Sequence, residues 1–272
     1  MELLATRRGS GRLADEDEPP GIEGKSVGAI LATPVLTALG PETVRVWLAT
    51  LDLDPPLQSR LSTALTPDEL TRASRYRFAR DRDRFVAARG LLRHALAAHL
   101  QTGPESIRLG YSANGKPFLE GRSDFPFNLS HAGPHLMIAI ARGRRLGVDI
   151  EPEPSARVIS ELATVVLSPP ERSALAGTAR PERPAWFGRM WTRKEAFIKA
   201  DGRGMEMLLE QIDVMTDPGS VRLLDPGPGW HRAADWSLRA IPAPAGHAAC
   251  VAAEGSAWSV EQAEWRISSE DS

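Results

Sequence analysis

The stretch that most constrains this chain is Leu146-Gly147-Val148-Asp149-Ile150-Glu151-Pro152. Alternate side chains of a β-strand face opposite sides, so Val148 and Ile150 are predicted to enter a core while Asp149 and Glu151 project together from the other face. Pro152 cannot extend a hydrogen-bonded ladder, so the strand is predicted to end where its acids emerge. Adjacent carboxylates repel unless a cation lies between them, and hard oxygen donors suit Mg2+. The stretch therefore predicts either a metal site or a solvated acidic strand end.

Length and composition bound the class of protein. The 272 residues can form one large domain or two small ones, and 42% hydrophobic and 25% charged residues are typical of a globular protein. The net charge of −2 argues against nonspecific nucleic-acid binding by the whole chain. No apolar run approaches the ~18 residues of a membrane span. The single cysteine, Cys250, fits a reducing compartment, so we expect a cytoplasmic protein without membrane or nucleic-acid partners.

The pattern of elements predicts a strand, then helices and short strands, and then a second set of helices and strands. Residues 1–40 are rich in Gly, Pro and charge, and we expect a flexible extension there. Residues 41–150 form the predicted first half, with a strand at 43–50, helices from Thr66-Pro67 and from near Asp81, and strands up to Glu151. Residues 151–265 form the second half, and residues 266–272 a tail. Helices are predicted there from Ser168-Pro169 and from near Pro184 to Gly202, with strands at 212–215, 236–241 and 248–253.

The first half contains an arginine-rich helical region. Its basic residues are Arg72, Arg75, Arg77, Arg80, Arg82, Arg84, Arg89 and Arg93, opposed by Glu69, Asp81 and Asp83. The local field is therefore positive although the whole chain is not. The region is either a solvated helix face or an anion site.

Two short segments of the first half offer polar groups for a ligand. Asn114-Gly115-Lys116-Pro117 is a turn whose free backbone N–H groups and ammonium could cradle a phosphate. Ser130 and His131 are neighbours on a predicted strand, so they point apart, and no G-x-S-x-G elbow supports a nucleophilic serine. His131 is either a hydrogen-bonded turn residue or a cationic donor to phosphate.

The helix that ends at Gly202 carries Trp191, Glu195 and Lys199 on one stripe, because residues four apart share a face. One interpretation is an i,i+4 salt bridge between Glu195 and Lys199, worth about 0.3 to 0.5 kcal/mol. However, tryptophan and phenylalanine neighbours indicate partial burial, and a partly buried acid and amine need a partner or a function.

Taken together, three acids, several cations and a turn histidine describe a site for a pyrophosphate or nucleotide with Mg2+. The segments that carry this chemistry are GVDIEP at 147–152, WTRKEAFIKADGRG at 191–204, FNLSHAG at 127–133 and NGKP at 114–117. In this order and spacing they resemble the Sfp-type 4'-phosphopantetheinyl transferases over roughly residues 43–255. The resemblance implies an α+β fold of two similar subdomains, related by pseudo-twofold symmetry, with the active site in the cleft between them.

The resemblance also implies the reaction and its residues. The family transfers the phosphopantetheine arm of coenzyme A to a serine of an apo acyl, peptidyl or aryl carrier protein, releases 3',5'-ADP and acts as a monomer. Asp149, Glu151 and Glu195 match the ligands of Mg2+, or Mn2+, and we expect Glu195 to be the general base. Lys199 and His131 are the other expected catalytic residues. The expected coenzyme A contacts are Arg72, Arg80, Lys116, Pro117, Asn128, Ser130, His131 and Lys199.

Two other functions remain open at this point. A Mg2+-dependent pyrophosphate hydrolase could use the same acids with water as nucleophile, and it would cleave coenzyme A or nucleotides without a protein acceptor. A non-catalytic module could dock its arginine-rich helix on nucleic acid or on an acidic protein, with steep salt dependence and indifference to Mg2+.

Overall fold

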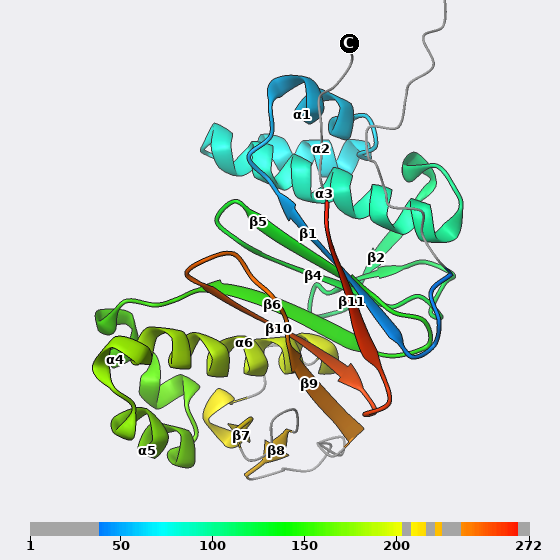
Figure 1. Ribbon diagram of the computed structural model, residues 1–272. Coiled ribbons are helices and arrows are strands. Elements are labelled where there is room, and N and C mark those ends of the chain that lie inside the picture. The colour runs from blue at the N-terminus through cyan, green and yellow to red at the C-terminus, as the bar shows by residue number, and fades with distance from the viewer. Residues whose placement is uncertain (1–37, 203–207, 216–220, 225–234, 266–272) are drawn as a thin grey trace, which may run out of the picture.

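Four layers of secondary structure are stacked in the order helices, sheet, sheet, helices (Figure 1). The computed structural model describes residues 38–202, 208–215, 221–224 and 235–265. The predicted N-terminal extension, apart from residues 38–40, and the predicted tail at 266–272 lie outside the described residues. Within the described part, no helix has the length and apolar character needed to cross a membrane.

The first sheet has four strands in the order β11-β1-β5-β4, with β11 parallel to β1 and the other pairs antiparallel. Its members are β1 (Thr43–Thr50), β4 (Phe127–Ala132), β5 (His135–Ile140) and β11 (Ser259–Glu264). Its outer face is covered by helices α1 (Pro55–Ser62), α2 (Pro67–Ser74) and α3 (Ala79–Leu100). The predicted strand at 43–50 is thus confirmed as β1.

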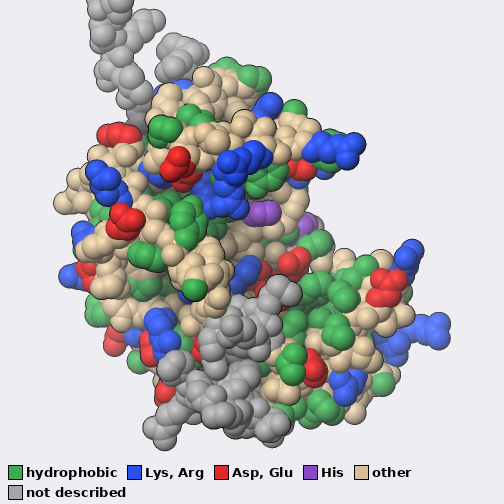
Figure 2. All heavy atoms as spheres, turned by 180° about the vertical axis from the view of Figure 1, so that it is seen from behind, with side chains coloured by type: hydrophobic (Ala, Val, Ile, Leu, Met, Phe, Trp, Pro, Cys, Tyr) green, Lys and Arg blue, Asp and Glu red, His purple; other side chains and the backbone are tan. Residues whose placement is uncertain are grey.

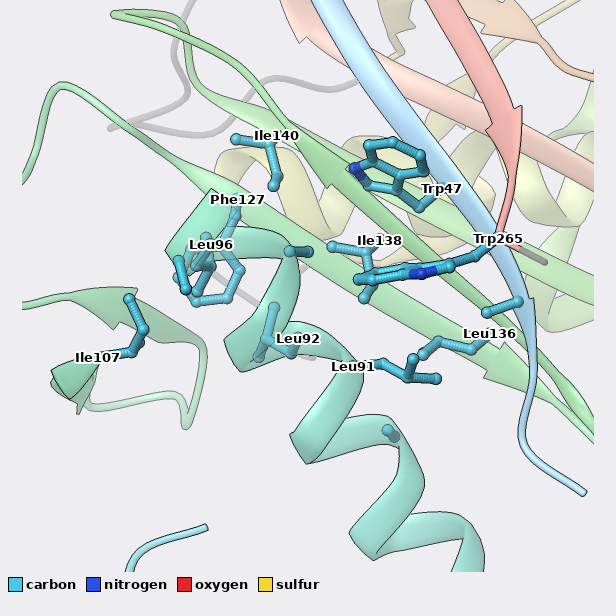
Figure 3. Close-up of a cluster of buried hydrophobic side chains, with 14 of the residues drawn as sticks. Trp47, Leu91, Leu92, Leu96, Ile107, Phe127, Leu136, Ile138, Ile140 and Trp265 are labelled. Atoms are coloured by element: carbon cyan, nitrogen blue, oxygen red, sulfur yellow. The ribbon is translucent and has the colours of Figure 1, made fainter. Parts of the chain in front are cut away.

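A core between α3 and this sheet fixes the outer layers of the first half (Figure 3). Leu91, Leu92 and Leu96 of α3 face the aliphatic side chains of β5 and the two tryptophans Trp47 and Trp265. The tryptophan ring centroids lie 5.4 Å apart, so the residue that follows β11 packs on β1 inside this core. The end of the described chain therefore belongs to the first sheet rather than to the second.

The second sheet is antiparallel, with the order β6-β10-β9, and comprises β6 (Leu146–Pro152), β9 (Trp236–Ala240) and β10 (His247–Glu254). Its outer face is covered by α6 (Arg183–Asp201), beside which lie α4 (Ala156–Val166) and α5 (Pro169–Gly177). Each half thus places one long helix on a sheet. The predicted mixed α+β class is confirmed.

The inner faces of the two sheets share a third core. Val44, Val46 and Met137 of the first sheet and Val148 and Ile150 of the second are all fully buried in it. The predicted inward direction of Val148 and Ile150 is confirmed, since their core separates the two sheets. The division between halves at residue 150 stays a prediction, because β6 spans it and pairs along its length with β10.

Capping boxes predicted the starts of α2 and α5, whereas helix α1, helix α4 and strand β11 were not expected. Thr66 and Glu69 form a capping box at α2, and Ser168 and Glu171 form another at α5. Helix α1 begins where Pro55-Pro56 was expected only to end a strand, because Asp54 caps it and proline is suited to a first helical turn. Strand β11 was also not predicted.

The remaining described elements are short connections. They are the 3-10 turns η1 (Pro104–Ser106), η2 (Arg180–Glu182) and η4 (Leu209–Gln211), the hairpin β2 (Leu109–Tyr111) and β3 (Pro117–Leu119), and the pair β7 (Ile212–Asp213) and β8 (Arg222–Leu223).

Candidate active site

A hydrogen-bonded triangle joins the two halves around a buried acid. Asp149 on β6 has an exposed fraction of 0%, and its Oδ1 accepts from Lys199 Nζ at 2.6 Å and from Ser130 Oγ at 2.9 Å. Lys199 Nζ also lies 2.9 Å from Ser130 Oγ. The three side chains come from β6, α6 and β4, so residues far apart in sequence meet at one point. Lys199 pairs here with Asp149, which replaces the simple i,i+4 salt bridge with Glu195 as an account of this lysine.

Close packing of β6 against α6 brings Asp149 to Lys199. A Cβ atom built on Gly147 would lie 2.2 Å from the carbonyl oxygen of Ala196 and 2.5 Å from the amide nitrogen of Ala200. Only glycine leaves room for the helix backbone at this distance. Gly202, with φ of 91°, then ends α6 in the left-handed conformation, which confirms the predicted helix end.

The amide of Asn128 ties the first sheet to the second next to this triangle. Its Oδ1 accepts from the backbone N–H of Val148 at 2.9 Å, and the side chain is buried. Asn128 was expected to contact coenzyme A. The structure shows it linking β4 to β6, and it also lines the cavity described below.

Glu151 and Glu195 lie near Asp149 and are electrostatically coupled to it. Burial, the charge of Asp149 and the charge of Glu195 raise the pKa of Glu151 to about 7, although Lys199 opposes the shift. Burial and the charge of Asp149 also raise the pKa of Glu195, opposed by Lys199 and a hydrogen bond from Trp191. The three acids predicted as a group are therefore close enough to perturb one another.

A cavity of about 370 Å³ opens beside these residues. It is lined from the first half by the turn at 114–117 and by Asn128 and Leu129, and from the second half by Glu195, Ile198, Lys199, Gly202 and Leu209. Figure 2 shows the molecular surface hollowed at the junction of the halves, where histidine, basic and acidic side chains gather. The site thus lies between the two halves and can admit a small charged molecule.

The turn that contains Lys116 differs from the expected phosphate cradle. The N–H groups of Gly115 and Lys116 already donate within the turn, to Ser112 O at 2.9 Å and Ser112 Oγ at 3.1 Å. Lys116 Nζ donates to carbonyls at the end of α6, those of Lys199 and, at 3.4 Å, Ala200. Burial lowers the pKa of Lys116 to about 8, assisted by the charge of Arg145. Lys116 therefore supports the helix end, while Pro117 lines the cavity.

His131 points away from Ser130, as the strand alternation predicted. Ser130 is buried and His131 is exposed. Partial loss of solvation, together with the charges of Lys199 and Arg84, lowers the pKa of His131, although the side chain still reaches solvent. Arg84 was not predicted as a neighbour of the site. Its Nε and Nη2 donate to Asp52, just after the end of β1, at 2.6 and 2.8 Å, and the charge of Arg84 acts on His131.

The arginine-rich region contains both paired and unpaired cations. Arg93 pairs with Glu69 at 2.8 Å, and the exposed Arg80 lies 3.6 Å from Asp81. Arg72 instead stacks on Phe85, with its Cζ 5.3 Å from the ring centroid. The predicted contacts of Arg72 and Arg80 with coenzyme A stay predictions.

A buried ion pair between α6 and α5 was also not predicted from the sequence. Lys194 Nζ lies 2.5 Å from Glu171 Oε2, both side chains have an exposed fraction of 0%, and the ammonium donates to Val166 O and Leu209 O. Since Leu209 lines the cavity, this pair connects the cavity wall to the helix that carries Glu195 and Lys199. The capping box at Ser168 predicted a role for Glu171, but not this long-range contact.

Comparison with known proteins assigns both halves to one family. Residues 145–252 match the family model of the 4'-phosphopantetheinyl transferase superfamily, and residues 56–142 match that of the 4'-phosphopantetheinyl transferase N-terminal region. The 4'-phosphopantetheinyl transferase HetI of Nostoc sp. is 34% identical over 72% of this chain and 84% of its own length. The 4'-phosphopantetheinyl transferase Sfp of Bacillus subtilis is 28% identical over 60% of this chain and 73% of its own.

A human relative, the L-aminoadipate-semialdehyde dehydrogenase-phosphopantetheinyl transferase, is 30% identical over 57% of this chain and 54% of its own length. The matched ranges contain β6 with its acids, α6 with Glu195 and Lys199, and the arginine-rich α2–α3 region. The predicted family is confirmed: this chain belongs to the 4'-phosphopantetheinyl transferase superfamily.

Proposed function

We propose that this protein transfers the 4'-phosphopantetheine group of coenzyme A to a serine hydroxyl of an apo carrier protein and releases 3',5'-ADP. The observation that carries the proposal is the meeting of Asp149, Ser130 and Lys199 from three elements, beside a cavity that Glu195 also lines. Membership of the family supplies the reaction class, and this geometry supplies charged groups of both signs where a pyrophosphate would lie.

The acids fit a divalent cation, which we propose to be Mg2+ or Mn2+ held by Asp149, Glu151 and Glu195. The Oδ2 atom of Asp149 is buried without a hydrogen-bond partner, and the charge of Asp149 raises the pKa of both glutamates. A cation would satisfy the oxygen and relieve the repulsion. Among the described residues no three His, Cys, Asp or Glu side chains form a ready-made metal centre, so phosphate oxygens of the substrate are proposed to complete the site. When bound, the cation neutralises charge on the pyrophosphate.

The protein's own residues then position the substrates and move a proton. Lys199 directs its ammonium at the same point as Asp149 and is proposed to bind a phosphate oxygen, together with His131. Glu195, which lines the cavity, is proposed to accept the proton of the carrier serine, directly or through water. Arg72 is proposed to hold the phosphate of the nucleotide.

Intact mass of several purified apo carrier proteins, incubated with coenzyme A and Mg2+, tests the reaction. The expected result is a mass increase equal to one phosphopantetheine, dependent on the protein and on the metal. Glu195→Gln is expected to abolish the increase and to leave coenzyme A binding within a few-fold. Cleavage of coenzyme A without any modified carrier would instead support a pyrophosphate hydrolase. If the protein instead binds an acidic partner with an affinity that does not depend on Mg2+, the non-catalytic module would be supported.

We also propose which carrier proteins the enzyme modifies and where in the cell it acts. The candidates are acyl, peptidyl and aryl carrier domains of fatty acid, polyketide, nonribosomal peptide or siderophore synthesis. We propose that the protein acts as a monomer in the cytoplasm, where its one cysteine, buried Cys250, stays reduced. Testing one carrier of each type in the mass assay separates these possibilities.

A further inference from the structure

Two histidines meet where the two sheets end. His135 is the first residue of β5 and His247 is the first residue of β10, and their ring centroids lie 4.9 Å apart with an interplanar angle of 84°. Both side chains are partly buried. Each strand lies in the interior of its sheet, since β5 pairs with β1 and β4, and β10 pairs with β6 and β9. This histidine pair therefore joins the two halves through well-supported strands.

Side-chain alternation places both rings between the two sheets. Met137, two residues after His135, and Ala249, two residues after His247, belong to the core that the inner faces share. The histidine pair thus forms the polar end of that core. On β6 the same alternation directs Glu151 to the opposite face of the second sheet, so the pair is separate from the acids of the candidate active site.

The distance between the rings suits a shared transition-metal ion. Imidazole nitrogens bind Zn2+, Ni2+ and Cu2+, whereas Mg2+ takes hard oxygen ligands. A metal–nitrogen bond of about 2.0 to 2.1 Å puts each ring centre about 3.2 Å from the ion, so two imidazoles at a roughly tetrahedral angle have centres about 5 Å apart. The observed separation of 4.9 Å matches this value.

A backbone hydrogen bond prepares His247 as a ligand. Its Nδ1 lies 3.1 Å from Ala245 O, and since a carbonyl only accepts, Nδ1 carries the proton and Nε2 of the neutral ring carries the lone pair. Such a bond orients the histidine ligands of metals. The N–H of His247 also donates to Pro244 O at 3.0 Å, so the turn holds the main chain as well. His135 can turn toward the same ion, because χ2 of histidine has broad wells.

The charges around the pair leave the rings neutral and ready for a metal. Burial, followed by the charges of His247 and Arg84, lowers the pKa of His135, and Asp52 opposes the shift. Asp52 and Arg84 pair with each other at 2.6 Å, so their effects largely balance. Two leucines or phenylalanines would extend the core here without the repulsion that protonated imidazoles suffer. Two imidazoles at this place therefore indicate a ligand.

We propose that His135 and His247 bind one transition-metal ion of the Zn2+, Ni2+ or Cu2+ class, and that the bound ion ties the first sheet to the second. Since no group of three His, Cys, Asp or Glu side chains among the described residues can hold a metal, water is expected in the remaining coordination positions. The site differs from the proposed Mg2+ or Mn2+ site in ligand chemistry and in position. Its test does not require the transfer reaction.

Calorimetric titration of the full chain with Ni2+, in an excess of Mg2+ that occupies the acids, measures the affinity of the site. His135→Gln and His247→Gln are each expected to weaken Ni2+ binding about tenfold or more, because one of two protein ligands is lost. His94→Gln is the matched control, since it removes a partly buried imidazole from α3, on the outer face of the first sheet. We expect it to change the affinity by less than about twofold. Equal affinities of the unchanged protein and both pair variants would overturn the proposal.

Electron paramagnetic resonance with one equivalent of Cu2+, again in excess Mg2+, counts the nitrogen ligands. The unchanged protein is expected to show the couplings of two imidazoles, and each pair variant those of one. One imidazole or none in the unchanged protein would refute the site without any variant. Two imidazoles in the pair variants as well would place the ion elsewhere and refute it too.

Thermal unfolding with and without Zn2+, in excess Mg2+, tests the tie between the sheets. Unfolding separates the two histidines, so Zn2+ is expected to raise the Tm of the unchanged protein and of His94→Gln, but not that of either pair variant. The curves without Zn2+ show whether each variant folds, and either pair variant alone suffices for the comparison. An equal rise in Tm for a pair variant would show that Zn2+ stabilises the protein from another site.

Discussion

The two carboxylate oxygens of Asp149 have different environments, and this difference gives the residue a direction. Oδ1 accepts from Lys199 and Ser130, while Oδ2 is buried without a partner. A carboxylate with one saturated and one open oxygen is pre-oriented for a ligand at the open side. The strand pattern of GVDIEP predicted the face on which Asp149 lies. Its contact with Lys199 depends on how β6 packs on α6, which the spacing of residues in sequence does not specify.

His99 provides a residue-scale prediction about pH and stability. Its Nδ1 lies 2.8 Å from Ala95 O and its Nε2 lies 3.3 Å from Arg45 Nη1, so Nδ1–H donates and neutral Nε2 accepts from the guanidinium. Burial, assisted by the charge of Arg45, lowers the pKa of His99 from its usual 6.5. The unfolded chain therefore takes up a proton below pH 6.5 that the folded chain does not. The contribution of His99 to stability is expected to be complete above pH 6.5 and to be lost as the pH falls toward its folded pKa.

Urea unfolding of the unchanged protein and of His99→Gln between pH 7.5 and 5.0 measures this contribution. The stability difference between the two is expected to shrink as the pH falls, because glutamine has no proton to gain. Taking the difference cancels the other titrating groups, including Glu151, whose raised pKa acts in the opposite direction. A difference that stays constant over this range would contradict the assignment of a neutral, buried imidazole.

At the element scale, the contact of β6 with α6 sets the distance between the halves of the active site, and Gly147 makes that contact possible. Gly147→Ala is expected to lower the free energy of unfolding by about 1 to 3 kcal/mol, because the added Cβ meets helix backbone that cannot move alone. Activity is expected to fall further than stability implies, since Asp149 and Lys199 lie on the two elements that would be pushed apart. Urea unfolding and the carrier mass assay measure the two effects.

Gly177→Ala is the control for this substitution. Gly177 is the last residue of α5, and a Cβ built on it would meet nothing within 4 Å. The free energy of unfolding of Gly177→Ala is expected to be unchanged or raised by up to about 1 kcal/mol, since alanine favours helix over glycine. Equal stability and activity of Gly147→Ala and Gly177→Ala would show that β6 and α6 are not in close backbone contact.

The ion pair of Lys194 and Glu171 ties α5 and the segment at Leu209 to α6. Lys194→Met is expected to destabilise the protein by about 3 to 5 kcal/mol, because it leaves a buried carboxylate without its counter-charge. Adding Glu171→Gln removes that charge and is expected to restore at least half of the loss. Urea unfolding of the two single variants and the double variant measures the coupling. A double variant destabilised by the sum of the single effects would show that the two side chains do not act as a pair.

The predicted elements differ in how far their signals were local. Helices α2 and α5 were predicted from a capping residue, a proline and a glutamate within four positions, and both capping boxes are present. Helix α1 was missed because its two prolines indicated a break, although proline is favoured in a first helical turn. Strand β11 was missed because its partner β1 lies some two hundred residues earlier, and an edge strand with one partner carries a weak alternation signal.

At the scale of the whole molecule, the two sheets share one buried core, and β11 returns the end of the described chain to the first sheet. Neither half could expose its inner sheet face without exposing several fully buried aliphatic side chains, among them Val46, Met137 and Val148. The motifs predicted two similar halves with a site between them. They could not predict that the halves are inseparable, because this follows from the shared core rather than from any motif.

We therefore expect the two halves to unfold in a single cooperative transition. Tryptophans lie in both cores, among them Trp47 under α3 and Trp236 under α6, so tryptophan fluorescence follows the unfolding of both halves. The variants Trp47→Phe and Trp236→Phe each weaken one core. In both variants the urea transitions followed by fluorescence and by far-UV circular dichroism are expected to coincide. Fluorescence and dichroism transitions that separate within either variant would show that the halves fold independently, with the active site assembled between them only afterwards.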